Sequence, residues 1–204
     1  MGHPGVSGFG VLALLFSLVQ PVQAQSSPQL DLTPFAGGAL FVNDLASDML
    51  VCDGGCERIQ TPKMDNGIAF GAHAGLRFGA WSLEGTAAMV PTSWSGEETG
   101  GGQRSVDTSV LILGGNVLYT IPTENQLMEV FLAAGGGIKS HSPDEGDSAT
   151  NPMGNVGLGL RVFISPSMAL RFEGRDYISP YEDGNVQNDL LVTVGLSFSP
   201  GGGS

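Results

Sequence analysis

The stretch ALRFEGRDYISP, from Ala169 to Pro180, alternates between two kinds of side chain. Successive side chains of a β-strand point to opposite faces, so these twelve residues describe two different surfaces. One face is formed by Arg171, Glu173, Arg175 and Tyr177. The other is formed by Leu170, Phe172, Gly174, Asp176 and Ile178. The class of fold depends on which of these faces points into the protein.

The composition favours many short strands in an environment different from that of soluble globular domains. Charged residues make up 14% of the 204 residues, well below the roughly 25% of soluble globular domains. Glycine occurs 32 times, about twice its average usage, and the hydrophobic share of 41% is too low for a bundle of membrane helices. The net charge of −12 excludes nucleic acid as a partner.

Eight stretches of the chain have this two-residue period, and lasting helical periodicity is missing. Each is about as long as a tilted strand that crosses a bilayer, roughly 9 to 11 residues. They run from Leu30 to Val42, Gly67 to Phe78, Trp81 to Pro91, Ser109 to Ile121, Met128 to His141, Gly154 to Ile164, Ala169 to Pro180 and Asp189 to Ser199.

The links between these stretches alternate in length. Long or polar links cover residues 43–66, 92–108, 142–153 and 181–188, and short links cover 79–80, 122–127 and 165–168. Long loops on one rim and short turns on the other are typical of a membrane barrel. The sequence therefore predicts an all-β fold, a closed eight-stranded antiparallel up-and-down transmembrane β-barrel with both ends on the short-turn side.

The polar strand faces carry small residues and nearly balanced charges, which suits a crowded lumen better than a solvated exterior. An unpaired charge in low dielectric costs several kcal/mol, and an Arg facing lipid costs about 2–4 kcal/mol, so we expect these charges to pair inside. The predicted lumen network consists of Arg77, Glu84, Arg161, Arg171, Glu173 and Arg175. Asp31 and Glu129 are expected near the short-turn rim, and Lys139 near the other rim. Asp176 is expected at the long-loop rim, where the lipid face ends.

Residues 1–24 are predicted to be a signal peptide, and residues 25–204 a single barrel domain. The apolar run from Gly10 to Ala24 places Val22 and Ala24 at the −3 and −1 positions of a signal-peptidase site. A buried core helix is the alternative, but Pro21 and the polar QAQSSPQ end the run abruptly.

Cys52 and Cys56, in VCDGGCER, are the two cysteines of the chain. In an exported protein such a pair is interpreted as a local disulfide, and the two glycines between them let the short loop close. A metal or redox site is the alternative, although CxxxC without a nearby His is a poor metal signature.

The sequence resembles the small outer-membrane β-barrel family of Gram-negative bacteria, the OmpA/OmpX-like type in its barrel-only form. The resemblance lies in the leader, the eight alternating strands, and the alternation of long loops with short turns. The closing TVGLSFS resembles the strand signal read by the barrel-assembly machinery, with Thr193, Gly195 and Phe198 at its polar, glycine and aromatic positions. The resemblance implies a monomer in the cell outer membrane, in contact with its lipids and lipopolysaccharide. It also implies a role in envelope integrity, adhesion or host interaction, with a surface ligand held by the acidic loops.

A structural, non-enzymatic role without a cofactor is favoured, with two alternatives. KSHSPDEG places His141 and Ser142 beside acidic residues, and one group of lipid A-modifying outer-membrane enzymes uses a Ser/His/acid site, but neighbouring strand residues project to opposite faces. A narrow porin-like channel is the second alternative, although an eight-stranded barrel is only just wide enough for its own side chains. The DEGD run from Asp144 could hold Ca²⁺ but lacks the spaced ligands of a calcium loop.

Overall fold

The computed structural model describes residues 28–42, 49–52, 56–98, 102–125, 127–144, 148–180 and 186–200. The predicted signal peptide, residues 1–24, lies outside this part of the chain. No helix among the described residues has the length and apolarity that crossing a membrane requires.

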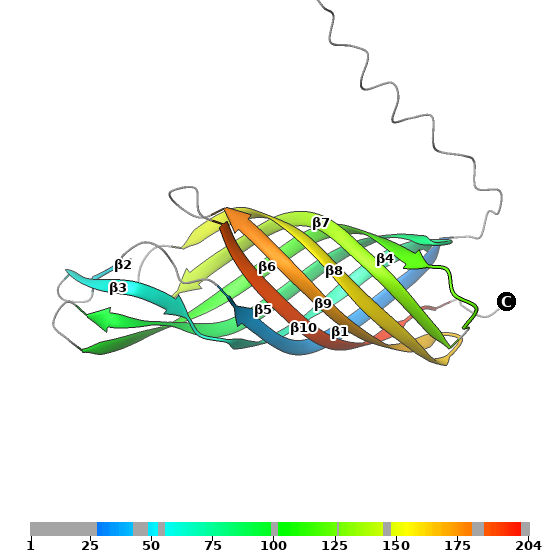
Figure 1. The fold of residues 1–204 in the computed structure, drawn as a ribbon, viewed down its shortest axis with the longest axis horizontal. Coiled ribbons are helices and arrows are strands. Elements are labelled where there is room, and N and C mark those ends of the chain that lie inside the picture. Colours follow the sequence, from blue (N-terminus) through cyan, green and yellow to red (C-terminus); the bar gives the residue numbers. More distant parts are fainter. Residues whose placement is uncertain are drawn as a thin grey trace, which may run out of the picture.

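Ten strands form one antiparallel sheet. They are β1 (Gln29–Phe41), β2 (Met49–Cys52), β3 (Cys56–Met64), β4 (Gly67–Phe78), β5 (Trp81–Glu98), β6 (Gln103–Ile121), β7 (Met128–Pro143), β8 (Ala149–Ser165), β9 (Met168–Pro180) and β10 (Val186–Phe198). Eight of them close into a barrel in the order β5-β4-β1-β10-β9-β8-β7-β6, because β6 pairs back with β5. The tilted strands wind around the long axis in Figure 1. The predicted eight-stranded closed barrel is confirmed.

The long-loop end contains more regular structure than the sequence predicts. Strands β5 and β6 stay paired through the expected 92–108 link, as far as Glu97 and Gln103. The two-residue alternation continues there, with Trp94 opposite Val106 and both buried on the inner face. The hairpin of β2 and β3 adds to the edge of β5 and extends beyond the barrel at the left of Figure 1.

The short-turn end is compact. Strands β4 and β5 are joined by Gly79 and Ala80 alone, and Gly79 has a φ of 62°, a left-handed conformation that glycine adopts without steric cost. Strand β1 starts opposite Arg77, and Phe198 at the end of β10 pairs with Met168. Both ends of the barrel chain therefore lie at this rim.

The two faces of Ala169–Pro180 point to opposite sides of the barrel wall. Arg171, Glu173 and Arg175 are at most 5% exposed in the lumen, whereas Leu170 and Phe172 are 37% and 44% exposed on the outside. The same inversion holds around the barrel. Further large apolar residues that face outward are Leu30, Ile68, Phe70, Leu83, Leu111, Val117, Leu132, Ile138, Leu158, Val192 and Val194.

Candidate functional site

A balanced ionic layer fills the middle of the lumen. Strands β9 and β5 lie opposite each other, with three strands between them in either direction around the barrel. Arg171 of β9 crosses this gap and donates from Nη1 to Oε2 of Glu84 at 2.5 Å, and from Nε to Oε2 of Glu173 at 3.0 Å. Arg175 donates to the same two carboxylates, with Nη2 at 3.1 Å from Glu84 Oε1. Two guanidinium groups and two carboxylates therefore neutralise one another.

His73 joins this layer as a hydrogen-bonding group. Its Nδ1 lies 2.8 Å from the hydroxyl of Thr86, which already accepts from Asn116 and Arg175. Nδ1 also lies 3.4 Å from Oε1 of Glu84. Nε2 points toward Glu173, whose Oε2 is 3.5 Å away.

Phe131 supports the layer from below. The guanidinium carbons of Arg161 and Arg171 each lie 4.7 Å from the centre of its ring, within cation–π distance. The ring occupies space left by Gly159, because a Cβ at that position would lie 2.2 Å from the Phe131 Cζ. A glycine on the lumen face thus makes room for the aromatic ring.

A second ionic group lies near the short-turn mouth. Arg77 makes a two-pronged hydrogen bond to Glu129, with Nη1 at 3.2 Å from Oε1. Arg161 is only 3% exposed, and its Nη1 is 3.7 Å from Oε2 of Glu129. A hollow of about 660 Å³ opens beside Arg77 and Glu129 at this end. The structure therefore places Arg77 and Arg161 with Glu129, apart from the four-charge layer formed by Glu84, Arg171, Glu173 and Arg175.

An apolar layer lies above the ionic layer. On β10, Leu191 lies between Thr193 and Asp189, and on β5 Ala88 and Val90 follow Thr86 on the inward face. The buried apolar cluster includes Phe35, Ala39, Ala69, Ala88, Val90, Val110, Ile112, Met153, Tyr177 and Leu191. An aqueous path along the lumen would have to cross both layers.

A third ionic group lies above the apolar layer. Lys139 is fully buried, and its Nζ donates to Asp189 Oδ2 at 2.5 Å and to Gln187 Oε1 at 3.0 Å. Lys139 thus lies toward the long-loop rim, but it is buried there and not exposed to solvent. Its partner Asp189 is not among the predicted network residues, although it shares the alternation of the lumen-facing Thr193 and Ser197.

The structure separates the residues of the enzyme alternative. His141 is buried at 6% exposure and lies edge-on to Trp94, with 6.0 Å between ring centres. Ser142 is exposed on the opposite face of β7. A nucleophile and its base must lie within hydrogen-bonding distance, so these neighbours do not form such a pair. The described residues contain no group of three or more His, Cys, Asp or Glu side chains that could hold a metal ion.

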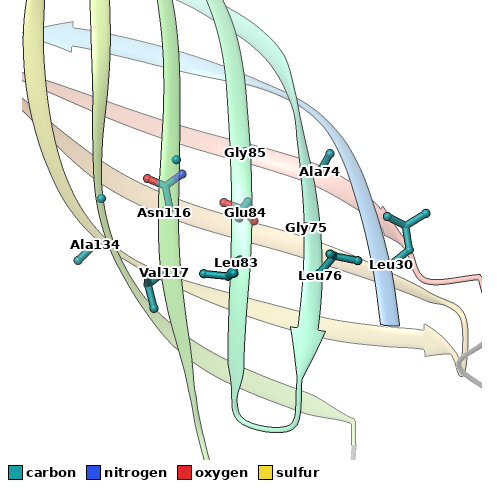
Figure 2. A pocket seen from close by; sticks show the side chains of 12 residues that line it. Leu30, Ala74, Gly75, Leu76, Leu83, Glu84, Gly85, Asn116, Val117 and Ala134 are labelled. Carbon is teal, nitrogen blue, oxygen red and sulfur yellow. The ribbon is translucent and has the colours of Figure 1, made fainter. Parts of the chain in front are cut away.

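The outer surface of the barrel carries an apolar hollow. It has a volume of about 650 Å³ and lies over the outward-facing Ala74, Leu83, Gly85 and Val117 on adjacent strands (Figure 2). Leucines and small residues line it together. The hollow presents almost no polar surface and offers no chemistry for a reaction.

The predicted disulfide stays a prediction. The backbones of Cys52 and Cys56 pair across the β2–β3 hairpin, which brings the two positions side by side. Their side chains lie outside the described residues.

Comparison with known proteins gives a consistent result. A family model described as outer membrane protein beta-barrel domain matches residues 9–198. The chain is similar to the crystal structure of Neisserial surface protein A, with a TM-score of 0.56 and 14% identity over 83% of this chain and 96% of that one. It is also similar to the outer membrane protein OprG from Pseudomonas aeruginosa, with a TM-score of 0.54 and 12% identity over 83% and 95%. No curated protein matches the sequence.

Proposed function

Since the chain belongs to the outer membrane protein β-barrel domain family and lies in the outer membrane, we propose that it is a non-conducting anchor that displays an acidic surface for adhesion or envelope integrity. The lumen carries this proposal. Its middle is occupied by four mutually paired charges, and the apolar layer above them excludes water. A barrel of this size gains stability from such packing and loses the space for a transport path.

The extracellular end supplies the surface. Long loops of outer-membrane barrels face the exterior, so the β2–β3 hairpin and the extended β5–β6 pair project outward from the cell. Residues 43–66, 92–108, 142–153 and 181–188 contain thirteen acidic and three basic residues, which is most of the net charge of −12. A surface of this charge favours a basic ligand, or an anionic one bridged by divalent cations.

Planar-bilayer recording tests the closed lumen. The purified protein should give no stepwise conductance. The matched variant removes the apolar layer by changing Leu191 and Ile112 to Gly; it shows whether the assay can detect a weakened plug. Regular conductance steps from the unaltered protein would overturn the proposal in favour of a narrow channel.

A second experiment tests the display role. Cells that express the protein are compared with cells expressing a variant in which residues 43–66 are replaced by a short Gly-Ser turn, with a heat-shifted gel band as the control for barrel folding. We expect the variant to lose adhesion to a basic protein-coated surface or to become sensitive to detergent. Unchanged adhesion and detergent resistance would contradict the proposal, and a mass change in lipid A that depends on the protein would favour an enzyme.

A further inference from the structure

Asp176 carries a carboxylate on the outward face of the barrel wall, which is mostly apolar. It lies on the outward face of β9 between Gly174 and Ile178, and is half-buried. Its cross-strand partners are Val156 on β8 and Leu190 on β10. It is the one ionisable residue among the outward positions of β8, β9 and β10. One outward apolar residue, Ile178, follows it before β9 ends at Pro180, and the partner of Ile178 is the polar Asn188, so Asp176 lies near the long-loop edge of the lipid-facing belt.

Every other acidic residue on the barrel strands below the long-loop extensions has a partner. Glu84, Glu173, Glu129 and Asp189 bind basic side chains, and Asp31 accepts from Thr33 and Ser199. Within the described part of the chain, no hydrogen bond or ion pair joins the Asp176 carboxylate to another side chain.

The bases nearest to Asp176 point into the lumen, where Arg175 and Lys139 bind other carboxylates. The loop that follows β9, residues 181–185, contains no base. The three bases of the long-loop end lie on β3 and β6, and β3 adjoins β5 on the opposite side of the barrel. A cation for Asp176 therefore has to come from outside the protein.

The surface around Asp176 leaves room for such a group. A Cβ built on Gly174 would meet no atom within 4 Å, and one on Gly154 would meet only the Gly135 carbonyl oxygen at 3.9 Å. Gly154 lies diagonally across β8 from Asp176, since its neighbour Val156 is the direct partner. Leu158 and Val192, both more than half exposed, lie on either side below. The carboxylate thus sits in an open notch above apolar surface.

We infer that Asp176 binds a lipid headgroup that carries a primary amine. An ionised side chain in the lipid belt costs a few kcal/mol unless it is compensated, and an ammonium group compensates it with charge-assisted N–H donors. The acyl chains of the same lipid then pack on Leu158 and Val192, toward the middle of the bilayer. The inference rests on the membrane location and is independent of the display role.

Lipid retention measured by native mass spectrometry tests this site. The protein is reconstituted in nanodiscs with equal amounts of phosphatidylethanolamine and phosphatidylcholine, which differ in that only the first has N–H donors. We expect about fivefold preferential retention of phosphatidylethanolamine, the factor that corresponds to a surface ion pair. Asp176→Asn should retain the two lipids equally, and Asp107→Asn, an exposed acid above the belt, should behave as the unaltered protein.

A second variant protects the test against misfolding. Asp176→Leu places an apolar side chain in an apolar belt, so it should fold, show the heat-shifted band and lose the lipid preference. Equal retention by the unaltered protein, or an undiminished preference in either Asp176 variant, would overturn the inference. Conductance and adhesion do not involve Asp176, so failure here leaves the proposed function standing.

Discussion

Arg171 and Asp176 lie five residues apart on the same strand, and their surroundings are opposite. Arg171 is 1% exposed in the lumen and binds two carboxylates from two strands. Asp176 faces outward among apolar side chains with no side-chain partner in the described chain. The comparison shows that burial alone does not decide whether a charge is tolerated; the number of opposite charges within reach decides it. Arg171 finds its opposite charges within the protein, on β9 and β5, whereas an opposite charge for Asp176 has to come from the surroundings of the barrel.

Removing Arg171 tests the lumen side of this comparison and should have the largest effect on stability. Arg171→Met leaves Glu84 and Glu173 with Arg175 as their main counter-charge, so we expect the free energy of unfolding to fall by about 3–5 kcal/mol. Urea unfolding in phospholipid vesicles, followed by the fluorescence of Trp81 and Trp94, measures it. The control is Arg77→Met at the more exposed mouth, where we expect about 1 kcal/mol. Equal losses for the two variants would mean that the middle layer has no special role.

Much of the fold follows from the sequence because its period-2 pattern is physically simple. Each strand of a closed barrel must separate lipid from lumen along its whole length, so the alternation recurs eight times and strand existence is well specified. The face assignment follows from the same reasoning, because Arg and Lys cannot face lipid at low cost.

The pairing of the lumen charges could not be derived in the same way. Arg171 finds Glu84 across the barrel, and Lys139 finds Asp189 three strands away, and these distances depend on strand tilt and stagger rather than on sequence spacing. The β2–β3 hairpin was missed because β2 is only four residues long and β3 has no apolar face at a two-residue period. Pro91 suggested a strand end, yet β5 continues through it because Ser93 and Ser95 keep the outward positions polar while Trp94 stays buried.

Placing a charge on the outer face of β9 tests the lipid-facing side of this comparison. Phe172→Arg puts a guanidinium group into lipid with no carboxylate beside it, and we expect a loss of about 2–4 kcal/mol in the same unfolding assay. Phe172→Leu is the control and should change stability by less than about 1.5 kcal/mol, because both residues are apolar. A tolerated Arg at this position would contradict the assignment of Leu170 and Phe172 to the lipid side.

His141 extends the comparison to a titratable group that is buried in the lumen but lies above the lipid-facing belt. On the outer face of β7, Ile138 is followed by Ser140 and Ser142, so His141 lies above the membrane-spanning part of the strand. Burial, and then the nearby charge of Lys139, lower the pKa of His141 to about 4. The imidazole is therefore neutral in the folded protein at pH 5, while the unfolded chain takes up a proton near pH 6.5. A lowered pKa of this kind stabilises the fold above pH 6.5 and the stabilisation is lost as the pH falls toward 4.

The acid sensitivity that His141 contributes should be the smallest effect, about 1–2 kcal/mol between pH 7 and pH 5. The unfolding free energy of His141→Phe, which keeps an aromatic ring against Trp94 and removes the titration, should fall less over this range than that of the unaltered protein. NMR of the labelled imidazole in detergent micelles measures the titration directly and should give a midpoint near pH 4. A midpoint near 6.5, or parallel pH profiles for the two proteins, would mean that water reaches the ring and that the upper lumen is open where its packing indicates that it is closed.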